Sequence, residues 1–217
     1  MIGLLAVLAT SPAGASPPSK PPSVTAPVKS EPPAPPFRFE GPLAAAHNAL
    51  RQGKPAEAKQ LLDKLRPSLK EAKLRDEAES LFGQSLIRQG LVKEAVTALE
   101  SVVKQAPQAL MSRLTLGEAY RLLGARDRER AIWNGFFDDH DAEKLDMNDP
   151  RAVRLLGLAA HYLGSYQDAY EQLQSAAALA KEKKHTAEFV LSSLALSELR
   201  IEKFEVGFAE VSVKEAL

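Results

Sequence analysis

The chain has 217 residues, of which 45% are apolar and 26% charged, with 28 basic side chains, 28 acidic side chains and no cysteine. This length suits one domain or two small ones, and the apolar fraction is enough for a sizeable core. A chain without cysteine has no disulfide scaffold, thiolate zinc site, cysteine nucleophile or thioether lipid anchor. Zero net charge argues against nucleic-acid binding by the molecule as a whole, which requires a basic surface.

Residues 1–15 resemble a secretory signal peptide. An apolar run at residues 2–9 is followed by Ala13, Gly14 and Ala15, the small-residue pattern of a cleavage site. The run is shorter than the roughly 20 apolar residues that span a bilayer. No Lys or Arg precedes it, so either the true start lies upstream or the signal is atypical. We expect a periplasmic, secreted or envelope-associated protein; a disordered leader on a cytoplasmic protein is the alternative.

Residues 16–41 form a proline-rich segment. Of the 15 prolines in the chain, 11 precede residue 43. Because proline fixes φ and lacks an N–H donor, this density favours extended polyproline II over helix or sheet. We therefore expect a disordered linker between an export signal and a folded domain.

Residues 42–217 are typical of an all-α domain. Apolar residues recur there at helical spacing, as in Leu155, Leu156, Ala159, Ala160 and Leu163. Asp149 and Pro150 have the pattern of a helix start, an acidic cap followed by proline. The predicted helices span residues 42–52, 55–66, 70–89, 92–105, 108–123, 127–138, 149–163, 166–182, 186–201 and 203–216.

Glycines divide this region into repeating units. Three pairs are spaced seven residues apart: Gly83 with Gly90, Gly117 with Gly124, and Gly157 with Gly164. The first glycine of a pair lets a neighbouring helix approach where a Cβ would collide. The second adopts the left-handed conformation that ends a helix and begins a turn. Each pair therefore predicts a helical hairpin.

A small residue follows the turn glycine by five positions in three units: Ala58, Ala95 and Ala169. Together with Leu116, Tyr120 and Pro107, this pattern resembles the tetratricopeptide repeat (TPR). The resemblance implies about five helix-turn-helix units stacked into a right-handed α-solenoid. In the third unit Ala131 follows Gly124 by seven residues, which predicts a longer turn at residues 125–128. The family's first Trp is absent, and Trp133 falls on a second helix.

The strongest catalytic-looking cluster is Asp138, Asp139, His140 and Asp141. Four consecutive residues cannot converge from one helix face, so a metal-dependent hydrolase around His140 is only a distant alternative. Gly-rich phosphate loops and nucleophile elbows are absent from the sequence. We expect no catalysis, no metal and no cofactor.

The TPR resemblance implies that the first helices line a concave groove. Arg51, Arg88, Arg121 and Arg154 place one arginine in each repeat, suited to the carboxylates of a bound peptide. The predicted groove residues are Arg51, Gln84, Arg88, Leu114, Glu118, Arg121, Arg154, Leu158, His161 and Tyr162. The same positions also select His47, Leu50, Ser80, Ile87 and Leu122. Leu43 and His47 stand where chaperone-binding members carry Lys and Asn, so that partner is not implied.

We expect an adaptor that binds a protein or peptide, with no nucleic acid and no small-molecule substrate. The alternative is a structural repeat region of a larger protein that binds no free ligand. Phe204, Val206, Phe208, Val211 and Val213 crowd the last predicted helix with apolar residues. This crowding indicates either a truncated domain or a face covered by a partner, including a second copy of the chain.

Overall fold

The computed structural model describes residues 41–203 and 213–214. The expected leader and linker lie outside the described residues, as does most of the predicted last helix; residues 213–214 are helical. The chain divides into two units, Met1–Pro35 and Pro36–Leu217, and the described residues belong to the second. These residues contain no strand. Their elements are α1 (Ala44–Arg51), α2 (Pro55–Leu65), the 3-10 helix η1 (Arg66–Ser68), α3 (Ala72–Arg88), α4 (Val92–Gln105), α5 (Leu110–Leu122), α6 (Arg126–Asp141), α7 (Pro150–Leu163), α8 (Tyr166–Glu182) and α9 (Thr186–Glu202).

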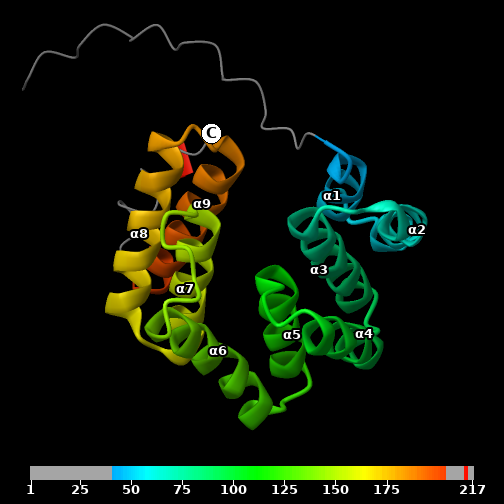
Figure 1. The fold of residues 1–217 in the computed structure, drawn as a ribbon, viewed down its shortest axis with the longest axis horizontal. Coiled ribbons are helices and arrows are strands. Elements are labelled where there is room, and N and C mark those ends of the chain that lie inside the picture. Colours follow the sequence, from blue (N-terminus) through cyan, green and yellow to red (C-terminus); the bar gives the residue numbers. More distant parts are fainter. Residues whose placement is uncertain (1–40, 204–212, 215–217) are drawn as a thin grey trace, which may run out of the picture. The chain divides into compact units, whose positions relative to one another are not determined.

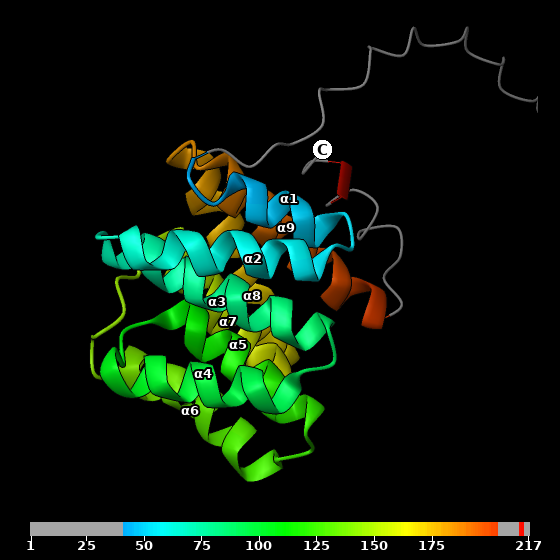
Figure 2. The same cartoon turned by 90° about the vertical axis from the view of Figure 1, so that its right-hand side faces the viewer.

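Successive helices pair into hairpins that stack in chain order (Figures 1 and 2). We call α1–α2, α3–α4, α5–α6 and α7–α8 repeats 1 to 4, and α9 begins a fifth. Within the stack α3 packs on α1, α5 on α3, α7 on α5 and α9 on α7, so the first helices form one continuous layer, which we call the inner layer. Each predicted helix from 42–52 to 186–201 has a counterpart in this order.

The second glycine of each pair ends its helix as the sequence predicted. Gly90, Gly124 and Gly164 have φ values of +78°, +70° and +82°, and Gly53 in repeat 1 has +71°. In this left-handed region an added Cβ is strained, which is why glycine stands at each reversal. The next helix begins two residues after each turn glycine.

The first glycine of each pair marks a close approach between paired helices. A Cβ on Gly83 would lie 2.7 Å from Leu99 Cδ1, and one on Gly157 would lie 2.9 Å from Leu173 Cγ. A Cβ on Gly117 would overlap the Trp133 ring. In each of these hairpins a large side chain of the second helix therefore packs directly against the glycine backbone of the first helix.

The longer turn predicted for repeat 3 is wrong. Helix α6 begins at Arg126, in the same register as the other second helices, and Ala131 is exposed. The constant position is nine residues after the turn glycine, occupied by large, fully buried side chains: Leu62, Leu99, Trp133 and Leu173. Glu129 takes the place that alanine has in the other repeats, and its Oε1 accepts a hydrogen bond from Trp133 Nε1 at 3.2 Å.

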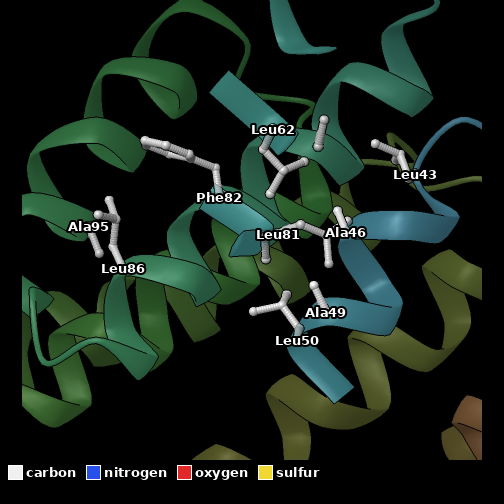
Figure 3. Close-up of a cluster of buried hydrophobic side chains, with 11 residues drawn as sticks. Leu43, Ala46, Ala49, Leu50, Leu62, Leu81, Phe82, Leu86 and Ala95 are labelled. Carbon is white, nitrogen blue, oxygen red and sulfur yellow. The ribbon is translucent and has the colours of Figure 1, made fainter. Parts of the chain in front are cut away.

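Small and branched side chains fill the space between repeats 1 and 2. Ala46, Ala49 and Leu50 on α1 face Leu81 on α3, with Leu62 of α2 beside them (Figure 3). These five side chains are each at most 4% exposed. A repeat cannot bury such a face alone, so stacking on its neighbour provides the stability.

Helix α7 starts as the sequence predicted, because Asp149 accepts a hydrogen bond from the backbone N–H of Arg151 at 3.0 Å. Helix α5 is capped differently, by a side chain of the preceding repeat. The Asp76 carboxylate on α3 accepts from the backbone N–H groups of Met111 at 2.9 Å and Ser112 at 2.8 Å. Burial raises the pKa of Asp76, and these hydrogen bonds offset only part of that rise.

Replacing Asp76 with alanine should lower the free energy of unfolding by about 1–2 kcal/mol, because two N–H groups of α5 lose their acceptor. Urea unfolding followed by circular dichroism measures the loss. Asp127→Ala, an exposed change in the first turn of α6, should stay within about 0.5 kcal/mol of the parent. Equal effects of the two substitutions would contradict the capping role.

Across residues 41–203 and 213–214, every helix is too short or too polar to cross a lipid bilayer.

Candidate protein-binding surface

The predicted groove residues occupy first helices, but they differ widely in exposure. Leu114 and Arg154 are buried, at 6% and 5% exposure. The exposed members are Arg51, Arg88 and Arg121, and the half-buried members are Gln84, Glu118, Leu158, His161 and Tyr162. The surface therefore offers fewer contact groups than the sequence pattern indicated.

Two predicted residues are taken up by the protein's own packing. Leu114 belongs to the core cluster around Trp133 and Phe136. The Arg154 guanidinium donates from Nε to Oε2 of Glu188 on α9 at 2.8 Å. A peptide carboxylate would have to displace Glu188 to reach this arginine.

Arg88 links repeats 2 and 1. Its Nη1 donates to the backbone carbonyl of Leu50 at 2.7 Å. That carbonyl lies in the last turn of α1 and also accepts from the backbone N–H of Gly53 at 3.1 Å, and the positive charge suits the negative end of the helix dipole. Arg88 is thus both an exposed cation and a cap for α1.

Glu118, Arg121 and Tyr162 form one contact group between α5 and α7. The hydroxyl of Tyr162 donates to Glu118 Oε1 at 3.1 Å, and the Arg121 guanidinium carbon lies 5.0 Å from the centre of the Tyr162 ring. Beneath them Tyr162 stacks on Trp133 with 4.5 Å between ring centres. The stacking of half-buried Tyr162 on buried Trp133 fixes the tyrosine that contacts both charged groups.

Burial raises the pKa of Glu118. The hydrogen bond from Tyr162 and the charges of Arg121 and Arg88 oppose that rise, and Glu198 on α9 adds to it. Burial and the adjacent Glu118 carboxylate raise the pKa of Tyr162 as well. The tyrosine therefore stays a neutral donor, and cationic and anionic groups alternate across this part of the surface.

Leu122 adds an apolar element to this group. It is 60% exposed and follows Glu118 by four residues, so the two share a face of α5. We call Arg88, Glu118, Arg121, Leu122 and Tyr162 the Arg121 patch. The patch lies at the C-terminal ends of α3, α5 and α7.

The remaining predicted residues contact other parts of the inner layer. His161 Nε2 lies 2.9 Å from Glu202 Oε2 on α9, and Gln84 Nε2 donates to Ser80 Oγ at 3.4 Å on its own helix. Leu158 packs between the core clusters of repeats 3 and 4. Arg51 is the last residue of α1 and interacts with its surroundings.

A set of ionisable residues, of which the sequence singled out only His47 and Arg154, crosses the inner layer in the N-terminal halves of its helices. Glu77 on α3 lies 2.8 Å from His47 Nε2 on α1 and accepts from Arg151 Nη2 on α7 at 3.1 Å. Glu188 on α9 accepts from Arg151 Nε at 3.0 Å and also from Arg154. We call His47, Glu77, Arg151, Arg154 and Glu188 the ion-pair chain.

The charges of the ion-pair chain support one another. Burial opposes ionisation of Glu77, yet the hydrogen bond with His47 and the charge of Arg151 hold its pKa below the ordinary value. Burial likewise opposes the charge on Arg151, but Glu188 and Glu77 raise its pKa. The Glu77–Arg151 pair is therefore ionised at neutral pH.

The acidic cluster at residues 138–141 does not converge on one point. Asp139 pairs with Arg113 on α5, and His140 Nδ1 lies 3.1 Å from Asp141 Oδ1. No group of three His, Asp or Glu side chains in the described part of the chain could hold a metal ion. This geometry gives no support to a hydrolase centred on His140.

No protein-family model and no curated protein matches the sequence. Among solved structures, the TPR protein TTC0263 of Thermus thermophilus is similar with a TM-score of 0.57 and 22% identity, over 81% of this chain and 88% of that one. The TPR-like repeats of a Podosopora anserina putative kinesin light chain have a TM-score of 0.46 and 19% identity, over 81% of this chain and 91% of that one. MamA of Desulfovibrio magneticus RS-1 has a TM-score of 0.40 and 22% identity, over 79% of this chain and 88% of that one. The likeness to the Thermus structure shows that this chain has the all-α fold of a TPR solenoid.

Proposed function

We propose that this protein is a non-catalytic adaptor that binds a segment of another protein at the Arg121 patch. The observation that carries the proposal is the exposure of Arg121 beside the 60% exposed Leu122, whereas the charges of the ion-pair chain pair with one another. A segment with a carboxylate next to an aliphatic side chain complements this pair, because guanidinium groups bind carboxylates in a fixed fork geometry.

The surroundings of Arg121 favour a protein partner over a nucleic acid. Glu118 and Glu198 lie beside the two arginines, so the patch is not the continuous basic surface that a phosphate backbone requires. Tyr162 holds one face of the Arg121 guanidinium, which lowers the entropy lost when the guanidinium binds a ligand. The TPR fold supports the same role, since helical solenoids present extended binding surfaces. The signal-like residues 1–15 support export as part of the proposal.

The proposal predicts the chemistry of peptides selected from a random displayed library by the purified protein. They should contain Asp, Glu or a terminal carboxylate within two residues of a Leu, Ile, Val or Phe. Arg121→Gln should weaken the binding of a selected peptide about tenfold in a fluorescence anisotropy titration, because one charge-assisted contact is lost.

Arg130→Gln is the matched control, since Arg130 is an exposed arginine on the second helix of the same repeat. It should leave the affinity unchanged. Selection of peptides without carboxylates, or equal affinities of the two variants, would overturn the proposed site. Failure to select any peptide would favour a structural repeat region that binds no free ligand.

A further inference from the structure

The ion-pair chain joins repeats that are not neighbours. Arg151 on α7 reaches Glu77 on α3 at 3.1 Å, and Lys73 on α3 donates to Asp149, the cap of α7, at 2.9 Å. Helix α5 lies between α3 and α7 in the stack (Figure 1). The two ion pairs therefore join repeat 2 to repeat 4, although repeat 3 lies between these repeats in the stack.

Ordinary stacking does not provide this link. In a solenoid each repeat contacts only its neighbours, so its curvature follows from small angles between adjacent repeats. The backbones of α3 and α7, both within the described residues, do not pack against each other. Long side chains alone join them directly, while α5 packs against both.

Burial makes the Glu77–Arg151 pair more than a surface ion pair, whereas Lys73 of the second pair is 73% exposed. The side chains of Arg154 and Glu188 are 5% and 10% exposed, whereas those of Glu77 and Arg151 are 20% and 26% exposed. Each of these partly buried charges is costly to leave without its partner, and only salt near about 1 M, where the screening length is about 3 Å, weakens such a pair appreciably. Opening the inner layer would hydrate Glu77 and Arg151 and exchange their mutual contact for water.

We propose that the ion-pair chain is a clasp that holds repeats 2 and 4 together and sets how far the inner layer opens. When the clasp is closed, the protein's own ion pairs occupy the N-terminal halves of the inner-layer helices. Only the C-terminal ends of α3, α5 and α7 are then open to a partner. When it is open, repeats 1 and 4 move apart by accumulated small rotations between neighbours. This inference concerns conformation and does not require the peptide site to be correct.

Spin labels can measure the separation directly because the chain has no cysteine of its own. Cysteines at Gln60 on α2 and Gln174 on α8, both exposed, would carry the labels for a pulsed electron resonance distance measurement. The otherwise unchanged chain should give one narrow distance distribution. Glu77→Gln should broaden it toward longer distances, with the ratio of closed to open molecules falling about tenfold.

Glu79→Gln is a matched control. It breaks the Arg66–Glu79 ion pair, whose side chains are 23% and 17% exposed, but which joins elements adjacent in sequence. Its distance distribution should match that of the otherwise unchanged chain. The clasp is overturned if Glu77→Gln leaves the distances unchanged, or if both variants broaden them equally.

A salt series on the labelled chain without the Glu77 change keeps the test independent of any folding defect. Raising sodium chloride from about 0.05 M to about 1 M should broaden the distribution in the same direction, since screening weakens the half-buried pairs. A distribution that is constant across the series would contradict a clasp made of charges.

Discussion

Gly117→Ala should lower the free energy of unfolding by about 3 kcal/mol, a large loss for one added methyl group. The new Cβ would overlap the ring of Trp133, which is 1% exposed and stacked on Tyr162 at 4.5 Å between ring centres. A ring confined on both sides cannot move aside, so the α5–α6 hairpin must separate or distort. Urea unfolding followed by the fluorescence of Trp133, the single tryptophan, would measure the loss.

Two companions separate packing from backbone strain. Gly124→Ala introduces a methyl where nothing lies within 4 Å, but at φ +70°, and should cost only about 1–2 kcal/mol. Trp133→Leu combined with Gly117→Ala should recover part of the stability lost by Gly117→Ala, because repeat 1 has Ala46 and Leu62 at the corresponding positions. Equal losses at 117 and 124, with no recovery in the double variant, would contradict the close-approach explanation.

Asp139→Ala should also cost about 3 kcal/mol, because it leaves a buried cation without its counter-charge. Arg113 is 7% exposed, pairs with Asp139 through Nη1, and lies with its guanidinium carbon 4.5 Å from the centre of the Phe136 ring. Water cannot replace the carboxylate fully at this depth. Urea unfolding of the variant and of the unchanged protein at neutral pH gives the difference.

The matched comparison is Asp63→Ala, which removes exposed ion pairs to Lys59 and Arg66 and should change stability by at most about 1 kcal/mol. Replacing both partners, Arg113→Met with Asp139→Ala, should be less destabilising than Asp139→Ala alone, since no charge remains buried. If Asp139→Ala lowers the free energy of unfolding no more than Asp63→Ala does, the buried Arg113–Asp139 pair stabilises the fold no more than exposed pairs do, and the prediction is contradicted.

The hairpin architecture could be predicted from the sequence because glycine has few roles inside a helical domain. Each member of the pairs Gly83 with Gly90, and Gly157 with Gly164, meets a separate steric demand, and the seven-residue spacing places the first inside a helix and the second at its end. The turn glycines also predicted where helices end, and Asp149 with Pro150 predicted where α7 begins. Two helices, α4 and α8, have the predicted bounds.

The register of repeat 3 could not be predicted from the alanine that was used to align the other repeats. Ala131 was the nearest small residue, but the constraint lies at Trp133, where the widest side chain meets the bare backbone of Gly117. A tryptophan at a position held elsewhere by leucine was the available signal. The register of a repeat is therefore set by the residue that contacts the first glycine, nine positions after the turn glycine, and not by the alanine five positions after it.

Which candidate surface residues are buried and which are exposed could not be predicted, because this depends on contacts between residues far apart in the sequence. Periodicity places Arg88, Arg121 and Arg154 on first helices at three different positions of the predicted groove, yet only the structure shows that Arg154 is buried against Glu188 while Arg121 is exposed. Glu77 and Arg151 stand at the same register, six residues before their glycines, with opposite charges. Their pairing depends on the angles between repeats, which are set by the packing of whole helices.

The central claim, that a protein segment binds at the Arg121 patch, is tested most directly by photocrosslinking. A photoreactive amino acid in place of Leu122 should crosslink a selected peptide through the residues next to its carboxylate, as mapped by mass spectrometry. The same amino acid at Gln174, exposed on α8, should give no crosslink. Crosslinks from Gln174 with none from Leu122 would contradict the account.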